Sequence, residues 1–411
     1  MRRLAMLLAA AAACAAAAAP SALASGGLAA RLGAAMRHSG AYSGAYVVNS
    51  TEGKTVFRWR ERTPRILASN TKLFTTATAL VRYGADGTLG TEVRGQGTLE
   101  EGTWKGNLYL RGGGDPSFGS ALFGRRNYGG ASSVEDLAAK LGELGIERVS
   151  GAIYGDESRF DSRRGTAATG WRPSTDLGPL SGLAFNRGLS SEGGFGFQSN
   201  PPAFAASRLR AALKAGGIKV SKGSHAGRAP AGSQVLVSED SPPMSKLIRI
   251  TNKPSDNYFA EMLLKDLALQ AYGKGTTGGG ARLASGFARR LGARARLVDG
   301  SGLSRGDRAS PYRVVRLLLA MQKRVEYPAF YDSLSIAGRD GTLKPRMRRG
   351  PARSRCRGKT GTLSNVSALS GYCRARSGDV YVFSILMNAS NPYGARAIQD
   401  RMAQALAGVR G

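Results

Sequence analysis

The strongest constraint on the fold is that strand-like segments stand at both ends of the chain. Near the N-terminus, residues 45–49 and 55–59 flank a short turn and have the composition of a β-hairpin. Near the C-terminus, residues 358–363, 367–373 and 380–387 alternate like three antiparallel strands. We expect the two ends to share one antiparallel sheet with helices on both faces, which is an α/β (α+β) fold.

Helical periodicity fills much of the chain between these strands. The expected helices cover residues 26–40, 69–84, 134–144, 205–215, 244–253, 255–272, 281–291 and 311–325, and a last one carries Ile398, Met402 and Leu406 on one face. Residues 278–280, three glycines, are expected to form a linker. From residue 87 to 243, short strand-like runs alternate with Gly-, Pro- and Ser-rich loops, which indicates an inserted domain.

The N-terminus predicts export. Two arginines, an apolar stretch and Ala22, Leu23 and Ala24 at a small-residue cleavage site are typical of a secretory signal peptide over residues 1–24. Cys14 leaves lipidation as an alternative, although the alanines before it match a lipobox poorly. No other segment is apolar enough to span a bilayer. We therefore expect no transmembrane anchor and a mature protein that is periplasmic or otherwise secreted to the cell envelope.

The chain is strongly basic. Its formal net charge is +31, from 59 basic and 28 acidic residues, and loss of the two leader arginines lowers it to +29. For an exported protein, such charge favours envelope polymers and lipid head groups as partners rather than nucleic acid. In residues 344–359, eight of sixteen residues are basic and none is acidic. This cluster is either a solvated loop or a surface that attracts anionic peptidoglycan peptides and other envelope polyanions.

Histidine is too scarce for two common kinds of hydrolase. His38 and His225 are the only histidines, and neither lies in a catalytic context, which disfavours a Ser-His-Asp triad. Three cysteines and two histidines are also too few and too scattered for a zinc site. We expect no metal and no cofactor, and a hydrolase of this composition would use a lysine or a carboxylate as its base.

The first of three short motifs is Ser69-Asn70-Thr71-Lys72, at the start of an expected helix. Residues three apart share a helix face, so the Lys72 ammonium can reach the Ser69 hydroxyl. A serine needs a base to become a nucleophile, and lysine can serve when burial or positive neighbours lower its pKa. Alone, the motif is more often an N-cap serine followed by a surface lysine, because such a spacing arises frequently by chance.

Two further motifs follow in order, Ser255-Asp256-Asn257 and Lys359-Thr360-Gly361-Thr362. The first precedes a helix, where its serine could relay a proton between two lysines and its asparagine could bind a substrate carbonyl and Lys72. The second begins a strand, whose edge can pair with an extended peptide while Gly361 allows close approach. Alone, they are also explained as a helix cap and a strand start. The ordered set is typical of class A β-lactamases and penicillin-binding proteins.

The chain resembles the class C low-molecular-mass penicillin-binding proteins, the D-alanyl-D-alanine carboxypeptidase/endopeptidase family of the penicillin-binding protein 4 type. Besides the three motifs, the resemblance rests on Gly-Gly-Gly-Asp-Pro at 112–116, Gly-Asp-Glu-Ser-Arg-Phe-Asp at 155–161, Ser-Asp-Asn-Tyr-Phe-Ala-Glu at 255–261, Asp-Gly-Ser-Gly-Leu-Ser-Arg at 299–305 and Ala-Gly-Arg-Asp-Gly-Thr-Leu at 337–343. It implies a serine β-lactamase/transpeptidase-like domain of residues 25–86 and 244–411. It also implies a large inserted mixed α/β domain at 87–243, with a smaller nested domain near 175–240.

The resemblance implies a serine D,D-peptidase of peptidoglycan. Such an enzyme hydrolyses the terminal D-Ala-D-Ala bond, D-Ala-diaminopimelate cross-links or both through an acyl-serine, and β-lactams inhibit it covalently. Ser69 would attack the carbonyl, Lys72 would accept its proton, and Asn257 would lie beside them. Ser255 and Lys359 would relay the proton to the leaving group.

The resemblance also implies contacts to the stem peptide. The substrate-binding residues would be Thr360, Gly361, Thr362, Arg305 and Asp156. Backbone N–H groups of Ser69 and Thr362 would form the oxyanion hole, and Asp156 and Arg305 would recognise the free end of the diaminopimelate. Asp156 is equally explained as a turn residue. Asp299 and Asp340 are expected to be structural. Glu261, the only acid soon after Asn257, is also expected to be structural, so penicilloyl adducts should be long-lived.

Two other functions stay open from the sequence. One is a β-lactamase or esterase on the same fold, which would have to deacylate quickly. The other is a non-catalytic cell-wall or polyanion-binding protein, which the high positive charge would suit.

The two cysteines outside the leader, Cys356 and Cys373, flank the third motif. If the C-terminal hairpin turns near residues 364–365, these cysteines face each other across two strands. A disulfide would then brace the strand that carries Lys359, and export would permit it. Two free thiols are the alternative.

Overall fold

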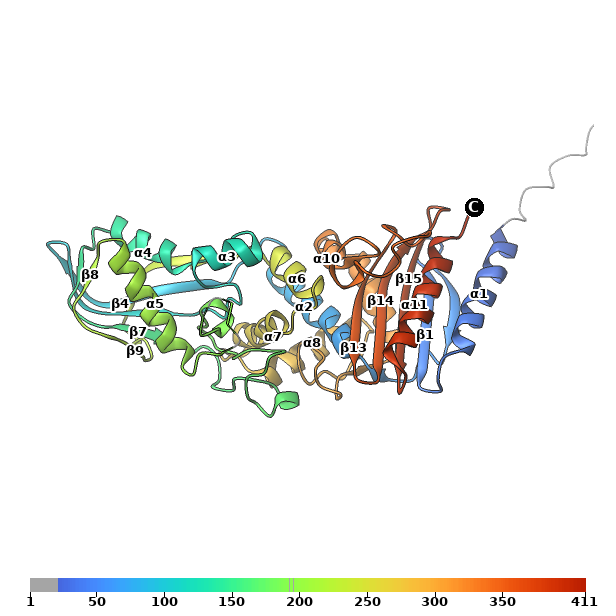
Figure 1. Ribbon diagram of the computed structural model, residues 1–411, viewed down its shortest axis with the longest axis horizontal. Coiled ribbons are helices and arrows are strands. Elements are labelled where there is room, and N and C mark those ends of the chain that lie inside the picture. Colours follow the sequence, from blue (N-terminus) through green and yellow to red (C-terminus); the bar gives the residue numbers. More distant parts are fainter. Residues whose placement is uncertain (1–20, 192, 195) are drawn as a thin grey trace, which may run out of the picture.

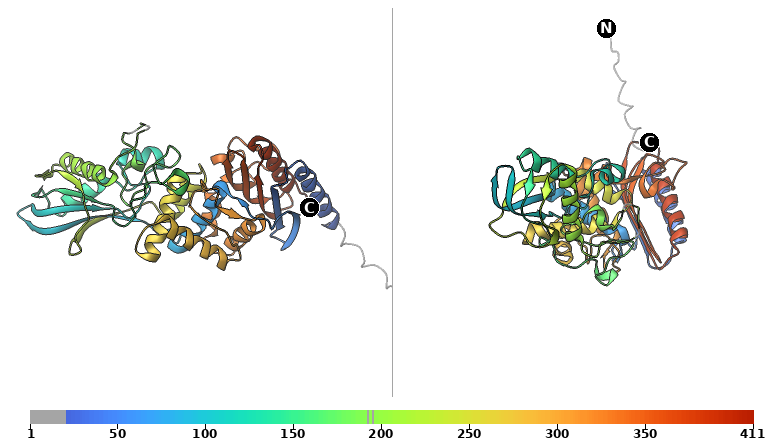
Figure 2. Two further views of the ribbon diagram at one scale, coloured as in Figure 1. Left: turned by 90° about the horizontal axis from the view of Figure 1, so that it is seen from below. Right: turned by 60° about the vertical axis from the view of Figure 1, so that its left-hand side comes forward.

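The computed structural model describes residues 21–191, 193–194 and 196–411 of the chain. The molecule is elongated, with one sheet toward each end and a helical layer between them (Figure 1). Figure 2 shows the same order along the long axis from below. Most of the predicted signal peptide, Cys14 included, lies outside the described residues. Among the helices that are described, none is long and apolar enough to cross a membrane.

The two ends of the chain form one antiparallel six-stranded sheet. Its order is β12 (Ser335–Ile336), β13 (Cys356–Leu363), β14 (Val366–Arg374), β15 (Val380–Asn388), β1 (Ser43–Asn49) and β2 (Lys54–Trp59). β1 pairs with β15 so that Val47 faces Phe383, which confirms the predicted shared sheet. Almost all residues of β1, β14 and β15 are buried, because helices cover both faces.

Different sets of helices cover the two faces of this sheet. On the outer face, α1 (Ser21–Arg37) and α11 (Pro392–Ala407) bury Leu32 and Met402 in one cluster with Ile385. The inner face carries α2 (Thr71–Tyr83), α6 (Met244–Asn252), α7 (Asn257–Tyr272), α8 (Thr277–Arg290), α9 (Pro311–Gln322) and α10 (Tyr327–Ser333). Their apolar side chains form one continuous buried cluster with the sheet. The predicted fold class, helices on both faces of an antiparallel sheet, is confirmed.

The predicted linker at residues 278–280 is wrong. These glycines lie in the first turn of α8. A Cβ on Gly280 would lie 1.9 Å from the carbonyl oxygen of Leu264 in α7, so glycine is what lets the two helices approach closely. The Thr276 hydroxyl caps the helix by accepting the Gly279 N–H at 3.0 Å. Capping and tertiary packing thus outweigh the low helix propensity of glycine.

A second sheet is made entirely of strands between Gly90 and Asp240. Its main path is β10 (Gln234–Asp240), β4 (Gly90–Glu100), β5 (Thr103–Arg111), β6 (Arg148–Val149) and β8 (Lys219–Val220), and β7 (Ile153–Asp156) and β9 (Ser224–Ala226) extend it beside β5. The helices of this part are α3 (Ala121–Tyr128), α4 (Val134–Glu143) and α5 (Pro201–Ala215). The described strands within 175–240 all join this sheet and form none of their own. The domain limits at 87 and 243 and the nested domain stay predictions.

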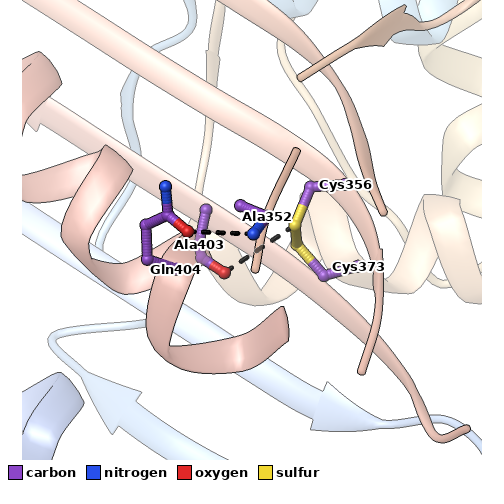
Figure 3. The surroundings of a disulfide bond; sticks show 5 residues. All are labelled: Ala352, Cys356, Cys373, Ala403 and Gln404. Atoms are coloured by element: carbon purple, nitrogen blue, oxygen red, sulfur yellow. Dashed lines mark hydrogen bonds between the residues drawn. A yellow bond between two sulfur atoms is a disulfide. The ribbon is translucent and has the colours of Figure 1, made fainter. Parts of the chain in front are cut away.

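The β13–β14 hairpin turns at residues 364–365. In this register Cys356 faces Cys373, and the two sulfurs form a disulfide (Figure 3). The hypothesis of a cross-strand disulfide is therefore confirmed against that of two free thiols. The Ala352 N–H donates to the Gln404 side-chain oxygen at 2.9 Å, which ties the approach to β13 to α11 (Figure 3). A further short ladder joins β3 (Arg65–Ile66) to β11 (Arg308–Ala309).

Candidate active site

The first motif lies where a 3-10 turn leads into α2. Ser69 is the middle residue of η1 (Ala68–Asn70), and Lys72 lies in the first turn of α2. Lys72 Nζ lies 3.1 Å from Ser69 Oγ, within hydrogen-bond distance. Ala68 has a φ of +47°, and a Cβ on Gly302 would lie only 1.9 Å from the Ala68 carbonyl oxygen. The turn that presents the serine is therefore held by close tertiary packing.

Lys72 is fully buried, and its ammonium donates three hydrogen bonds. The acceptors are Ser69 Oγ at 3.1 Å, Asn257 Oδ1 at 2.6 Å and the Ser301 carbonyl oxygen at 2.6 Å. Burial lowers the pKa of Lys72 to about 8, and neighbouring carboxylates, Asp299 foremost, oppose part of that shift. A lysine with this pKa is partly neutral near pH 8, so it can accept a proton from the serine.

The second motif precedes α7 and reaches Lys72 through Asn257. The Asn257 side chain has its oxygen on Lys72, while its amide nitrogen donates to the Asp176 carbonyl oxygen at 3.1 Å. Ser255 has a φ of +67°, in the left-handed region that a residue with a side chain rarely adopts. Its hydroxyl makes no hydrogen bond to the rest of the described chain, so it is free to bond a substrate.

Lys359 lies on β13, beside the first motif. Its side chain is fully buried, and burial together with the positive charge of Lys72 holds its pKa well below the usual range. The Asn70 side chain donates to the Lys359 carbonyl oxygen at 2.9 Å. A Cβ on Gly361 would lie 3.0 Å from the Ser69 nitrogen. The glycine therefore allows β13 to lie directly against the turn that carries the serine.

Three of the predicted substrate-binding residues lie along this hairpin. Thr360 donates through its hydroxyl to Thr342 Oγ1 at 2.7 Å. Thr362 is exposed, and its hydroxyl accepts a hydrogen bond from the Arg396 guanidinium at 3.1 Å. Arg305 donates to Asn365 and Ser364 at 2.9 and 2.7 Å, in the turn after β13. A row of hydroxyl and guanidinium groups thus follows the strand past Ser69.

The structure does not bring Asp156 to this group. It is the last residue of β7, which belongs to the second sheet (Figure 1). Its carboxylate accepts the backbone N–H groups of Ser158 at 2.8 Å and Ala229 at 3.0 Å, and only 1% of the residue is exposed. These contacts favour the alternative of a turn-forming residue, and a role in substrate recognition stays a prediction.

Buried acids lie behind Lys72. Glu261 accepts the N–H groups of Gly300 and Ser301 at 2.9 and 2.7 Å, which directs the Ser301 carbonyl toward the lysine. Burial raises the pKa of Glu261 to about 8. Asp299 likewise accepts two backbone N–H groups of the same loop, each at 2.7 Å. Both carboxyl groups thus fix the backbone of residues 300–304.

The described residues hold no group of His, Cys, Asp and Glu side chains placed to bind a metal ion.

Sequence reasoning missed several contributors to this site. They are the carbonyl groups of Ser301 and Asp176, the guanidinium of Arg396, and the guanidinium of Arg187, which donates to the Asp256 carboxylate at 2.7 Å. The residue type cannot predict a contact made by a backbone carbonyl group, because every residue has such a group. The only signal was that Ser301 lies within the segment 299–305, whose sequence supported the family resemblance.

Comparison with known proteins identifies the family. A model of the D-Ala-D-Ala carboxypeptidase 3 (S13) family matches residues 26–189 and 195–409. The chain belongs to this family. The D-alanyl-D-alanine carboxypeptidase of Actinomadura sp. strain R39 is 29% identical over 454 residues, which cover 90% of this chain and 82% of the relative. Carboxypeptidase DacB of Mycolicibacterium smegmatis is 30% identical over 401 residues, which cover 92% and 84%.

The fold has close parallels among solved structures. Penicillin binding protein 4 of Haemophilus influenzae superposes with a TM-score of 0.76 at 19% identity, and the match covers 90% of this chain and 97% of that one. Together with the family match, this similarity confirms the predicted family, the fold class and the prediction that this chain is a serine-type peptidase.

Proposed function

We propose that this chain hydrolyses peptidoglycan stem peptides at the terminal D-Ala-D-Ala bond, at D-Ala-diaminopimelate cross-links or at both. We also propose that penicillin acylates it at Ser69. The observation that carries the proposal is the buried Lys72 ammonium 3.1 Å from Ser69 Oγ, with Asn257 at 2.6 Å. The family supports the substrate class, since the relative from Actinomadura is named a D-alanyl-D-alanine carboxypeptidase.

Acylation begins when neutral Lys72 takes the Ser69 proton as Oγ attacks the carbonyl carbon. The backbone N–H groups of Ser69 and Thr362 stabilise the oxyanion. The C–N bond then breaks, and the leaving amine takes a proton relayed through Ser255 and Lys359. The depressed pKa of Lys359 suits this step, because a lysine with its usual pKa would hold its proton near neutral pH.

The substrate lies along β13 as an additional extended strand. Gly361 leaves the backbone open beside Ser69, and the hydroxyls of Thr360 and Thr362 bond the carboxylate of the terminal D-alanine. Arg396, which already reaches Thr362 at 3.1 Å, adds positive charge at that end of the strand.

Water completes the reaction by hydrolysing the acyl-enzyme, and the penicillin adduct persists. A fast β-lactamase needs a base for the deacylating water. Glu261 is unsuited to that role because it is fully buried and one of its oxygens already accepts two backbone N–H groups. This favours a D,D-peptidase over a β-lactamase on the same fold.

A fluorescent penicillin tests the proposal directly. The wild-type protein should keep a covalent label through denaturing electrophoresis, and a Ser69→Ala variant should keep none. Digestion of purified muropeptides would then separate the two peptidase activities by their products. Rapid turnover without a lasting label would instead favour a β-lactamase, and neither label nor turnover would favour a non-catalytic wall-binding protein.

We further propose that the protein works in the cell envelope and contacts its anionic polymers through the loop before β13. A cavity of about 810 Å³ in this loop is lined by Arg339, Lys344, Arg348, Arg349 and Arg353, with Gly338 and Pro345. Arg339 bonds Ser354 at 2.7 Å, and the other four side chains make no ion pair within the described chain. Five converging cations without an acid favour a ligand with several negative charges.

Polyphosphate is a suitable probe of this cavity. Each dissociation constant should be measured at several salt concentrations, because salt screens contacts between exposed charges. A triple variant, Arg348→Gln, Arg349→Gln and Arg353→Gln, should bind at least tenfold more weakly than wild type. The matched control neutralises three exposed arginines elsewhere, Arg289→Gln, Arg290→Gln and Arg294→Gln. An equal loss in both variants would attribute binding to net charge and contradict a site in this loop.

A further inference from the structure

Two segments of the inserted part, residues 87–243, reach the second motif. The Asp176 carbonyl oxygen accepts the amide of Asn257 at 3.1 Å. Arg187, in η3 (Asn186–Gly188), donates from both terminal nitrogens to the Asp256 carboxylate, at 2.7 and 3.2 Å. The two residues that follow Ser255 are therefore both held from outside the six-stranded half of the molecule.

The second motif needs such support because its backbone is strained. Ser255 holds a φ of +67°, which surrounding contacts must maintain. Asp256 carries most of these contacts: its N–H donates to the Thr251 carbonyl at 2.9 Å, and its carboxylate caps α7 by accepting the Phe259 N–H at 2.9 Å. Arg187 therefore bonds the same carboxylate that fixes the turn of the chain from Ser255 into α7.

Arg187 is itself held in place. Its guanidinium lies 5.0 Å from the ring centre of Tyr258 and 5.6 Å from that of Phe259, on the first turn of α7. A planar guanidinium that stacks on rings and makes two parallel hydrogen bonds fixes a carboxylate in both distance and orientation. A lysine in the same place could supply the charge but not this fixed plane.

We propose that Arg187 is a positioning residue for acyl transfer, through which the inserted part sets Ser255 and Asn257 against Lys72. The inference rests on the proposed acyl-serine chemistry. It assigns to the inserted part a direct share in assembling the active site.

The contact also has an electrostatic consequence for Lys72. The ionisable groups that face Lys72 are the carboxyl groups of Asp299, Glu261, Asp256 and Asp307, each of which raises the pKa of Lys72 when it is ionised, and the amine of Lys359 on β13. Arg187 neutralises one of these acids, Asp256. Without the guanidinium, that charge is uncompensated and favours protonated Lys72. The pH at which acylation becomes half-maximal should then move upward.

The test measures the second-order rate constant of labelling by fluorescent penicillin between pH 6 and pH 10. Arg187→Gln should lower the plateau at least tenfold and shift the half-maximal pH upward. Arg187→Lys keeps the charge but not the bidentate plane, so we expect a loss of about threefold with the half-maximal pH unchanged. Thermal unfolding of each variant shows whether it is folded.

The matched control is Arg208→Gln. Arg208 also belongs to the inserted part and stacks on Phe185 and Phe204 at 5.5 and 5.9 Å, but it pairs with no carboxylate in the described chain. Rates and pH profiles of both Arg187 variants that match those of Arg208→Gln would overturn the inference. If Arg187→Gln fails to fold, the Arg187→Lys rate alone decides. Failure of the wild type to label would instead contradict the proposed function.

Discussion

The two walls of the active site are held in different ways. The sheet wall, Cys356–Leu363, is fixed by its ladder to β14 and by a disulfide to a residue 17 positions away. The loop wall, residues 255–257, is bonded by the Arg187 guanidinium and by the carbonyl of Asp176, which belong to the segment 87–243. One wall is thus braced covalently and locally, and the other by polar contacts with remote segments. Lys72 lies where they meet, bonded to Asn257 of the loop wall and repelled by Lys359 of the sheet wall.

Replacing Lys72, which lies between the two walls, should have the largest effect on the labelling rate. Lys72→Gln takes away the base for Ser69, and loss of general-base catalysis costs about 10²–10⁴-fold in rate. We expect penicillin labelling to slow by about 10³-fold, measured by stopped-flow fluorescence. The thermal unfolding midpoint serves as the control for folding. A variant that folds and labels within tenfold of wild type would show that Lys72 is not the base.

Displacing the sheet wall should come next. Gly361→Ala places a Cβ 2.9 Å from the Leu67 carbonyl oxygen and 3.0 Å from the Ser69 nitrogen, so the strand must move away from the serine. Misplacement by about 1 Å can cost ~10²-fold in rate, and we expect labelling to slow by about that factor.

The control for this variant is Gly394→Ala, because a Cβ on Gly394 in α11 meets no atom within 4 Å. Its labelling rate should equal that of wild type. Equal rates for the two alanine variants would mean that β13 does not need to approach Ser69 so closely.

The rate of penicillin labelling should depend on pH through Lys72, which lies between the two walls. The neutral form of Lys72 is the active one, and its pKa is about 8. Labelling should therefore rise with pH up to about 8 and level off above it, by roughly 50-fold between pH 6 and pH 8. The rate constant measured in a constant-ionic-strength buffer series checks this. A flat profile, or a midpoint below pH 6, would contradict the assignment of Lys72 as base.

Removing the disulfide should have the smallest effect on acylation. Cys356→Ala with Cys373→Ala opens a loop with a sequence separation of 17, which should lower the free energy of unfolding by about 3 kcal/mol. The ladder between β13 and β14 persists, so labelling at 25 °C should stay within about threefold of wild type. Urea unfolding and labelling, measured on the same preparation, separate the two effects. A loss as large as that of Gly361→Ala would show that the ladder alone does not hold the sheet wall.

The sheet wall could be predicted from the sequence, and the loop wall only in part. Local alternation located the strands, and the turn at residues 364–365 set the register that brings Cys356 opposite Cys373. The motifs predicted Ser69, Lys72 and Asn257, but no local sequence pattern indicates that Arg187 pairs with Asp256. That contact depends on how residues 87–243 fold, which short-range patterns do not encode.

One expectation is wrong for a reason that lies in the tertiary structure. The three glycines at residues 278–280 predict a linker because glycine has a low helix propensity, whereas close packing on Leu264 places them in a helix. The Asp156 carboxylate bonds the backbone of Ser158 and Ala229, and its role in substrate recognition stays a prediction. At both positions the residue type alone does not reveal the tertiary contacts.

The pairing of β1 with β15 constrains the order in which the molecule can assemble. Val47 faces Phe383, so these two neighbouring strands become available at nearly opposite ends of synthesis. The second sheet, whose strands all lie between Gly90 and Asp240, can form much earlier. Pairings so distant in sequence are slow to form, because a long chain must be closed first. The turn that carries Ser69 also lies against β13, so a chain that has been made only as far as the second sheet carries no complete catalytic centre.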